Sequence, residues 1–363
     1  MSRPIRARLD WTALRHNHGV VKRHAAAARV WSVVKADAYG HGLLAAARAL
    51  AEIADGFALV ELEGAIALRD AGFRQPILML EGPYRPEDLS LFAEFELTPV
   101  LHARWQVDAL IAACLPRRQE VYLKLNTGMN RLGFDPDEFP AALDSLAAAD
   151  CLHAVTLMTH FADADEPRGI ASQLAAFRAM AGNRRLPASL ANSAAILRFP
   201  EAHADWVRPG IMLYGSSPFP AVQSAQALEL QPVMTLESEL IAVRKLAPGD
   251  TVGYGSCFVA EHPMRVGIVA CGYADGYPRH APTGTPVAIA GRRSRTLGRV
   301  SMDKICVDLD GMPLEVGVGS TVTLWGGRGD MHVAADDVAS AAGTVAYELF
   351  CALAARVPVE EID

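Results

Sequence analysis

The feature that most constrains the fold is a regular alternation of short apolar runs and amphipathic stretches between residues 11 and 227. The apolar runs are rich in β-branched residues and indicate strands, whereas the stretches between them carry Ala and Leu at helical spacing. Several of these stretches end at Gly or before Pro, as helices do. The predicted strands are 30–35, 57–60, 76–81, 97–101, 121–126, 155–160, 188–192 and 207–215.

Strands that alternate with helices indicate parallel β/α units. Eight such units favour a closed (β/α)8 barrel of the TIM type. A doubly wound open sheet is the alternative, because the pattern alone does not show closure. The dinucleotide-binding form of that alternative is weakened, because no GxGxxG follows the first predicted strand.

The pattern changes after residue 227. Short β-branched runs interrupted by Gly, Pro and Asp predict a mainly-β domain, with one helix near 334–342. We therefore predict two domains, a barrel over 1–227 and a β-domain over 228–363. The extreme N-terminal residues could pair with the β-domain.

Composition excludes several function classes. A net charge of −7 does not favour nucleic acid as a partner. The chain start, MSRPIRARLDW, lacks the apolar region of a secretory signal, and no apolar run is long enough to span a bilayer. The six cysteines are scattered, which is typical of reduced thiols. We expect a cytoplasmic protein that binds neither membrane nor nucleic acid, and we expect no metal.

In such a barrel, functional side chains collect at the C-terminal ends of the strands. Lys35 ends the first predicted strand, where desolvation favours the neutral amine that a Schiff-base lysine needs. The alternative is a lysine that extends its apolar stem to water. The glycines in the following AYGHG segment favour the functional reading, because they allow close backbone approach.

Other strand ends carry further polar groups. Lys124 lies on the fifth predicted strand, Arg131 follows in a Gly-bounded loop, and His160 ends the sixth. Each has a structural alternative, as a solvated loop charge or a satisfied histidine. Ser193 and the backbone amides after the eighth strand would suit a phosphate. A lysine and a phosphate cradle at one barrel mouth together indicate pyridoxal 5′-phosphate (PLP).

Nine motifs, in order and across nearly the whole chain, resemble those of the alanine racemase family. They are VVKADAYGHG, KLNTGMNRLG, THFADAD, ANSAA, VRPGIMLYG, GYGSCF, GYADGYPR, LGRVSMD and AYELFCALAARVP. The resemblance implies a PLP-dependent isomerase that interconverts L- and D-alanine. The product would supply peptidoglycan synthesis, or the enzyme would act in alanine catabolism.

The resemblance also implies residue roles. Lys35 would carry the cofactor and act as one catalytic base, and Tyr254 of the partner subunit would act as the other. Arg131 would meet the PLP phenolate oxygen, Arg208 the pyridine nitrogen, and His160 would hydrogen-bond Arg208. The phosphate ligands would be Tyr39, Ser193, Gly210, Ile211 and Tyr347. The substrate site would include Arg131 with Met302 and Asp303 of the partner, and Lys124 matches a lysine that is often carbamylated.

These roles imply a homodimer with shared active sites. One alternative is a non-catalytic PLP-binding barrel protein, which would lack the second domain. A PLP decarboxylase is another, but its Gly-rich phosphate motif is missing from this sequence. A racemase of broader amino-acid specificity is the third, because the pocket determinants are not obvious from one sequence.

Overall fold

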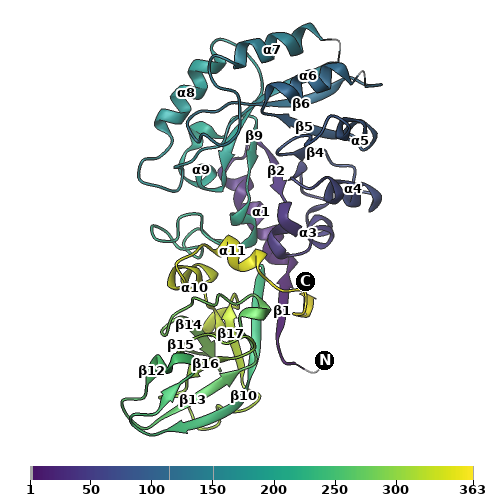
Figure 1. Ribbon diagram of the computed structural model, residues 1–363. Coiled ribbons are helices and arrows are strands. Elements are labelled where there is room, and N and C mark those ends of the chain that lie inside the picture. The colour runs from purple at the N-terminus through teal and green to yellow at the C-terminus, as the bar shows by residue number, and fades with distance from the viewer. Residues whose placement is uncertain (1–2, 114, 150, 363) are drawn as a thin grey trace. The chain divides into compact units, whose positions relative to one another are not determined.

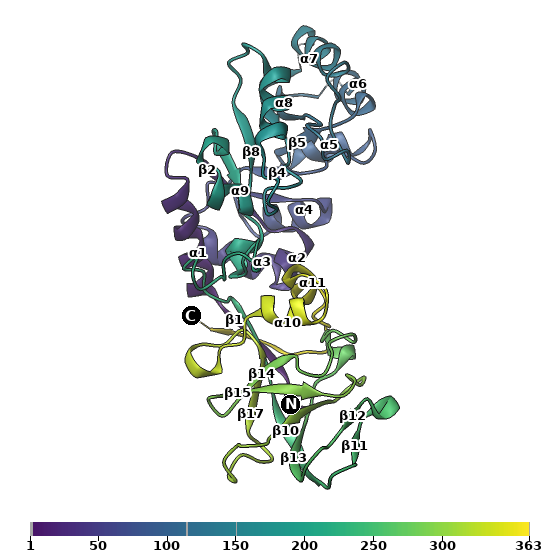
Figure 2. The ribbon, with the colours of Figure 1, turned by 90° about the vertical axis from the view of Figure 1, so that its left-hand side faces the viewer.

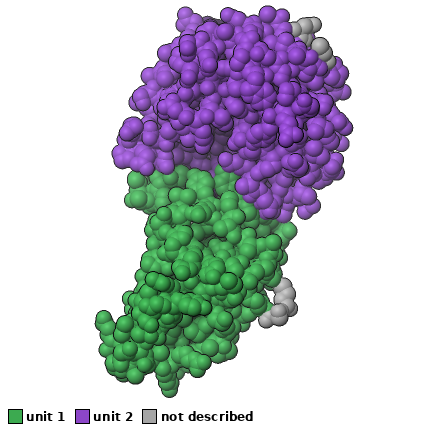
Figure 3. Space-filling model, in the orientation of Figure 1, with its two compact units in different colours: residues 1–16, 39–41, 214–363 green, residues 17–38, 42–213 purple. Residues whose placement is uncertain are grey.

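The computed structural model describes residues 3–113, 115–149 and 151–362, so Cys114 lies outside the described residues. The chain forms two compact units (Figure 3). Unit 1 comprises Met1–His16, Tyr39–His41 and Tyr214–Asp363, and unit 2 comprises Asn17–Ala38 and Gly42–Leu213. Each is described separately below. The division into functional domains at residues 227 and 228 stays a prediction.

Unit 2 is built on a closed barrel of eight parallel strands (Figure 1). Closure is made by the last strand, which pairs with the first through Arg29↔Trp206 and Val30↔Val207. The predicted barrel is therefore confirmed, and the open-sheet alternative is wrong. The strands are β2 (Arg29–Val33), β3 (Gly56–Leu59), β4 (Ile77–Met79), β5 (Leu97–Leu101), β6 (Gln119–Lys124), β7 (Leu152–Met158), β8 (Ala188–Asn192) and β9 (Trp206–Arg208).

Helices connect these strands and lie outside the barrel (Figures 1 and 2). The first helix begins after Asp10, whose carboxylate accepts a hydrogen bond from the Ala13 amide at 2.9 Å, as an N-cap does. The helices are α1 (Trp11–His24), α3 (Leu43–Leu50), α4 (Leu62–Asp70), α5 (Asp88–Glu94), α6 (Arg104–Ala112), α7 (Phe139–Ala148), α8 (Ala171–Ala181) and α9 (Ser193–Arg198). No helix in the described ranges has the length and apolar character to cross a membrane.

Several predicted strands end too late. The strand predicted at 30–35 ends at Val33, and Lys35 begins the next element. The strand predicted at 155–160 ends at Met158. The strand predicted at 207–215 ends at Arg208, and Ile211–Tyr214 is a 3-10 helix. Periodicity does not detect the residue at which ladder pairing stops, so these predicted ends are set by residue type alone.

Aromatic side chains fill the barrel interior. The Trp31 ring on β2 stacks on the Trp206 ring of the adjacent β9, with ring centroids 4.2 Å apart. The Trp31 indole N–H also donates a 2.9 Å hydrogen bond to the Tyr122 hydroxyl on β6, on a different side of the barrel. These three side chains therefore point inward. Because side chains alternate along a strand, Lys124 and Arg208, two residues after Tyr122 and Trp206, face inward as well.

The segment after β2 has an unusual backbone. In α2 (Lys35–Gly40), four consecutive non-glycine residues, Ala36 to Tyr39, have φ between 52° and 55°. L-residues in this left-handed conformation cost roughly 1–2 kcal/mol each. Local hydrogen bonds hold the segment, because the Ala36 amide donates to Glu61 at 3.1 Å and the Leu43 amide donates to Asp37 at 2.6 Å. Such strain concentrates at functional sites.

Unit 1 is built on an eight-stranded, mostly antiparallel sheet, which confirms the mainly-β prediction. Its strand order is β13-β16-β15-β14-β17-β10-β1-β18, and β1 near the chain start pairs antiparallel with β10. The strands are β1 (Arg6–Asp10), β10 (Met234–Leu246), β13 (Met264–Val269), β14 (Pro286–Ile289), β15 (Arg292–Leu297), β16 (Ile305–Asp308), β17 (Thr321–Trp325) and β18 (Val359–Ile362). A separate hairpin is formed by β11 (Thr251–Val252) and β12 (Phe258–Val259).

Two short helices, α10 (Ala335–Ala341) and α11 (Ala346–Cys351), belong to the same unit, and α10 lies where a helix was predicted. The 39–41 segment packs closely against α11. A Cβ atom at Gly40 would lie 2.1 Å from the Phe350 carbonyl oxygen, and Gly40 has φ +76°. Only glycine fits this position, for both steric and conformational reasons.

We predict that Gly40→Ala lowers the free energy of unfolding by about 2 kcal/mol or more, because it combines a backbone clash with a disfavoured φ. The thermal unfolding midpoint, followed by circular dichroism, measures the change. Gly19→Ala in α1 is the matched control, since nothing lies within 4 Å of its Cβ position. The control should be neutral or mildly stabilising. Equal midpoints for the two variants would contradict the prediction.

Candidate active site

Two cationic side chains are buried at the C-terminal ends of barrel strands. Lys124 is the last residue of β6, and Arg208 is the last residue of β9. Arg208 donates hydrogen bonds to the Ser189 hydroxyl at 2.7 Å, the Thr159 carbonyl at 2.6 Å and the Leu190 carbonyl at 3.1 Å. The guanidinium is thereby fixed in one orientation.

Burial lowers the pKa of both Lys124 and Arg208. Burial, followed by the charges of Arg208 and Arg131, lowers the pKa of Lys124 to about 8. Burial also lowers the pKa of Arg208 to about 10, so the guanidinium remains charged at neutral pH. About a tenth of Lys124 is then a neutral, nucleophilic amine at pH 7, far more than for an exposed lysine.

Arg131 lies in a loop that folds back on β6. The Phe134 amide donates to the Lys124 carbonyl at 2.8 Å, and the Asn126 amide donates to the Phe134 carbonyl at 2.9 Å. Inside the loop, the Asn126 side-chain oxygen accepts from the Asn130 amide at 3.0 Å. This network joins the Arg131 loop to the strand that carries Lys124, and the charge of Arg131 acts on both Lys124 and His160.

His160 lies two residues after β7 rather than at its end. Burial lowers the pKa of His160 well below its ordinary value, and the charges of Arg208 and Lys124 lower it further. The imidazole is therefore neutral at physiological pH. The predicted hydrogen bond between His160 and Arg208 stays a prediction, because the described contact between them is electrostatic.

Ser193 and the chain after β9 converge. The Ser193 hydroxyl oxygen accepts hydrogen bonds from the Gly210 amide at 2.9 Å and from the Met212 amide at 3.5 Å. Asn192 caps α9, because its side-chain oxygen accepts from the Ala195 amide at 3.0 Å. Ser193 and the 210–212 amides thus lie together at the ends of β8 and β9, and their role as phosphate ligands stays a prediction.

Lys35 follows β2, and its charge acts on both Lys124 and His160. Five predicted site residues in unit 2 are therefore electrostatically coupled at one barrel mouth: Lys35, Lys124, Arg131, His160 and Arg208. Glu81 is an acidic group that acts on Lys124. Lys124 and Arg208 are buried, Lys35 is half-buried and Arg131 is exposed, and this excess of positive charge favours an anionic ligand.

The predicted residues Tyr39 and Tyr347 belong to unit 1. Their ring centroids lie 5.9 Å apart, and Tyr39 also stacks on Tyr214 at 4.7 Å. Burial raises the pKa of Tyr39 far above its ordinary value, so its phenol stays protonated and can donate a hydrogen bond. The rings of Tyr39, Tyr214 and Tyr347 thus pack together within unit 1.

Tyr254 is carried by the loop of the β11–β12 hairpin and is 70% exposed. Gly253 and Gly255 on either side both have positive φ, which allows the tight turn. The Arg299 guanidinium lies beside the loop, 3.1 Å from the position that a Cβ of Gly255 would take. Tyr254 thus lies on an exposed, tightly turned loop with the Arg299 guanidinium beside Gly255.

Met302 and Asp303 lie in the turn before β16. Met302 is 53% exposed, and Asp303 accepts a 2.6 Å hydrogen bond from the Arg356 guanidinium. Within unit 1, Tyr254, Met302 and Tyr273 are all exposed large side chains.

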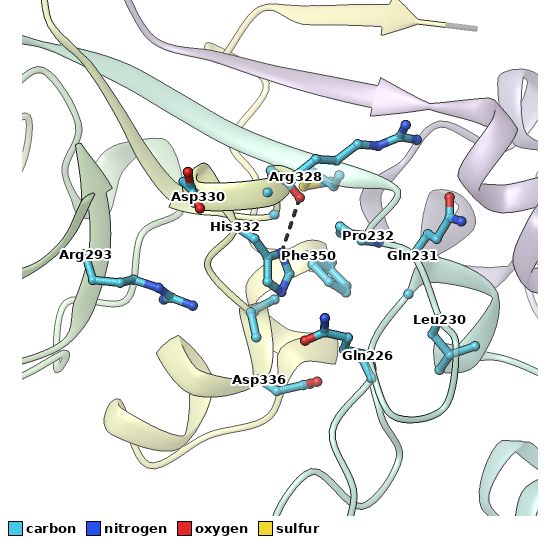
Figure 4. Close-up of a pocket in the computed structure, with 18 of the residues that line it drawn as sticks. Gln226, Leu230, Gln231, Pro232, Arg293, Arg328, Asp330, His332, Asp336 and Phe350 are labelled. Atoms are coloured by element: carbon cyan, nitrogen blue, oxygen red, sulfur yellow. Dashed lines mark hydrogen bonds between the residues drawn. The ribbon is translucent and has the colours of Figure 1, made fainter. Parts of the chain in front are cut away.

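Unit 1 also contains a cavity of about 560 Å³, which is lined by His332, Asp336, Gln226 and Phe350 among others (Figure 4). The His332 ring bonds the Gly327 carbonyl at 3.2 Å, and the buried Asp336 carboxylate accepts from the Ser217 amide at 3.1 Å. None of the predicted site residues lines this cavity.

Sequence reasoning missed the supporting residues. Thr159 and Ser189 accept from Arg208, and Asn126 shapes the loop of Arg131. Small polar residues in or next to strands carry no periodic signal, so only their position beside predicted site residues could have drawn attention to them.

The residues fit PLP chemically. The cofactor needs an amine for its aldehyde, donors for its phosphate, and partners for its phenolate oxygen and ring nitrogen. Unit 2 supplies Lys35, the Ser193 hydroxyl with the 210–211 amides, and the guanidinium groups of Arg131 and Arg208. The 2.9 Å bond from the Gly210 amide to the Ser193 hydroxyl shows that these two polar groups lie side by side, as ligands of one phosphate would.

A closed parallel barrel with coupled cations at its mouth, joined in one chain to a β-domain, defines a two-domain barrel enzyme. Family models for the N-terminal and C-terminal domains of alanine racemase match residues 9–218 and 233–361. The chain is 59% identical to an alanine racemase of Nitrosospira multiformis, over 98% of this chain and 99% of that one. It therefore belongs to the alanine racemase family, whose members are PLP-dependent isomerases.

Solved structures agree with this assignment. The biosynthetic alanine racemase of Pseudomonas aeruginosa is similar, with a TM-score of 0.94 and 44% identity over 99% of this chain and all of that one. The alanine racemase of Acinetobacter baumannii has a TM-score of 0.91 and 38% identity, over 99% of this chain and 100% of that one.

Proposed function

We propose that this chain interconverts L-alanine and D-alanine with PLP as its cofactor. The observation that carries the proposal is the coupled set of cationic side chains at the barrel mouth, which includes a candidate cofactor lysine and lies in the same unit as the Ser193 hydroxyl and the 210–212 amides. Membership of the alanine racemase family supports the choice of reaction and substrate.

Each polar group has a proposed role toward the cofactor. Lys35 would hold its aldehyde carbon, Arg131 its phenolate oxygen and Arg208 its ring nitrogen. Ser193, Gly210 and Ile211, with the phenols of Tyr39 and Tyr347, would hold the phosphate. When bound, PLP acidifies the α-hydrogen of an amino acid by withdrawing electrons from its Cα.

Two bases are needed, because racemisation removes a proton from one face of Cα and delivers one to the other. We assign Lys35 Nζ to one face and the Tyr254 phenol of the partner subunit to the opposite face.

Arg208 limits the other chemistry of the site. A guanidinium can only donate, so Arg208 would leave the ring nitrogen of the cofactor unprotonated. The bonds to Ser189, Thr159 and Leu190 hold Arg208 in place for this role. The neutral His160 adds no positive charge beside it. Side reactions that need full delocalisation into the ring, such as transamination, would thereby be suppressed.

We propose a homodimer in which each active site takes residues from both subunits. Support comes from the exposure of Tyr254 and Met302, which the family places against a partner's substrate. Arg131 would bind the substrate carboxylate from one side. The Met302 amide and Asp303 of the partner subunit would complete the substrate site.

Lys124 is a proposed carbamylation site. Its amine is buried, its pKa is about 8, and it lies within reach of the charges of Arg208 and Arg131. A neutral amine is the form that reacts with CO2, and the resulting carbamate would be an anion that positions Arg131. The local excess of positive charge stabilises such an anion.

The physiological setting is also a proposal. The enzyme would work in the cytoplasm, consistent with thiols at Cys257, Cys271 and Cys306. It would supply D-alanine for peptidoglycan or act in alanine catabolism. A racemase of broader specificity is the alternative that an assay must separate. A non-catalytic PLP-binding barrel is disfavoured, because the chain carries both alanine racemase domains.

The first prediction concerns the substrate. The purified protein with PLP should convert L-alanine to D-alanine and exchange the α-hydrogen in deuterated water, because both bases act at Cα. L-Serine and L-lysine, assayed in parallel, should react much more slowly. Comparable rates for all three would favour the broader racemase.

The Lys35→Ala variant lacks the proposed cofactor lysine and should therefore not exchange the α-hydrogen of alanine. Borohydride reduction of the holoenzyme followed by peptide mapping should place the pyridoxyl group on Lys35. A label on another lysine would overturn this assignment, and a protein that binds no PLP would overturn the function.

The second prediction concerns shared sites. Lys35→Ala and Tyr254→Phe chains should each be inactive alone. Random exchange of subunits should restore about a quarter of wild-type activity, because half of the dimers are hybrids with one intact site of two. Activity and subunit exchange are measured in the same mixture. Complete exchange without recovery of activity would contradict the sharing of sites between subunits.

The third prediction concerns Lys124. Exchange of the native holoenzyme into 13C-bicarbonate should give a carbamate carbonyl signal that is missing in Lys124→Ala. At a fixed pressure of CO2 the signal should weaken between pH 8 and pH 6, because the neutral amine falls from about a half to about a hundredth of the total. A signal of equal size in Lys124→Ala would reject the site.

A further inference from the structure

Asp275 is a fully buried carboxylate in unit 1 that holds two arginines from opposite ends of the chain. Arg3 donates to its two oxygens at 2.8 and 2.9 Å, and the Arg356 Nε donates at 2.7 Å. The Gly272 amide donates to the same carboxylate at 2.9 Å. The Asp275 side chain has no exposed surface, so these donors replace all of its water.

Arg356 makes a second ionic contact. Its Nη2 donates to Asp303 at 2.6 Å, while its Nε is held by Asp275. The guanidinium therefore bridges a buried anchor and the turn that carries Met302 and Asp303. Because the guanidinium is planar and rigid, fixing one edge on Asp275 fixes the direction of the other edge toward Asp303.

The backbone gives a parallel connection. The Tyr273 amide donates to the Ser301 carbonyl at 3.0 Å, and the Ala274 amide donates to the Met302 carbonyl at 3.0 Å. A Cβ at Gly272 would lie 2.3 Å from both carbonyl oxygens. The 272–275 segment thus packs directly under the 301–303 turn, and Asp275 is the side chain that ties it to Arg356.

The electrostatics of Asp275 agree with this arrangement. Burial acts to raise the pKa of the carboxyl group, but the hydrogen bonds from Arg3, Arg356 and Gly272 outweigh it and leave the pKa lowered. The carboxylate is therefore ionised at neutral pH. A buried charge of this kind is tolerated only while its partners are in place, so removing Arg356 disturbs the whole turn.

We propose that Arg356 and Asp275 are positioning residues for substrate binding, which hold the 301–303 turn so that the Met302 amide donates to the substrate carboxylate while Asp303, paired with Arg356, lines the substrate site. This inference rests on the proposed function, which gives that turn its role at the substrate site. Neither residue needs to touch the reacting atoms. Their effect is on where the substrate carboxylate binds.

The test compares Arg356→Gln with Arg295→Gln. Arg295 forms a comparable ion pair with Asp308 at 3.0 Å in the same unit but does not contact the 301–303 turn. Arg356→Gln should raise KM for L-alanine roughly tenfold or more with little change in kcat, because a misplaced binding group weakens binding uniformly. Arg295→Gln should leave both constants unchanged.

A binding measurement separates positioning from general damage to the fold. Propionate has the carboxylate of alanine without its amine, so its dissociation constant for the holoenzyme, measured by calorimetry, should rise in Arg356→Gln by a factor similar to that of KM. PLP affinity should stay at the wild-type value. A wild-type KM and propionate affinity in a folded Arg356→Gln, or an equal loss of PLP affinity, would overturn the inference.

Arg356→Lys covers the case in which the Gln variant does not fold. Lysine keeps the charge next to Asp275 but cannot make both directed bonds, so it should give a smaller rise in KM and in the propionate constant. A wild-type KM for this variant would then reject the inference. A wild-type protein that does not racemise alanine would instead reject the proposed function, and the two failures are thereby distinguished.

Discussion

Closure of the eight-stranded barrel is the constraint on which the site depends. Once β9 pairs with β2, alternate side chains of every strand must point into a packed interior. Trp31, Tyr122 and Trp206 fill that interior. The residues two positions after Tyr122 and Trp206 are Lys124 and Arg208, so the same alternation carries these cations to the C-terminal mouth and desolvates them there.

Desolvation then decides the chemistry of each group. Lys124 becomes a partly neutral amine, His160 becomes a neutral imidazole, and Arg208 stays charged because guanidinium is so strongly basic. The barrel thereby turns several similar cationic side chains into groups with different proton-transfer and hydrogen-bonding properties. An anionic cofactor and a substrate carboxylate would compensate the remaining charge.

Unit 1 contributes groups of another kind. Tyr254 and Met302 lie on exposed turns. The Arg299 guanidinium lies beside the first turn. Arg356, which is bonded to Asp275, contacts the second turn through Asp303. Contacts that hold a turn in place lower the entropy that binding would otherwise lose. The proposed role of Tyr254 at a partner's site would benefit from such contacts.

The sequence by itself determined the alternating β/α units, the β-domain and the candidate site residues, because strand alternation and local motifs lie within short segments. Closure of the barrel was decided only by the pairing of β9 with β2. The predicted strands extend too far at Lys35, His160 and 209–215, because residue type alone does not show where ladder pairing stops. Only the tertiary structure decided the left-handed backbone at Ala36–Tyr39, because none of these residues is a glycine, the residue type that predicts a positive φ. The same holds for the Arg3–Asp275–Arg356 network, since its members lie more than 80 residues apart in the chain and meet only when the sheet of unit 1 has formed.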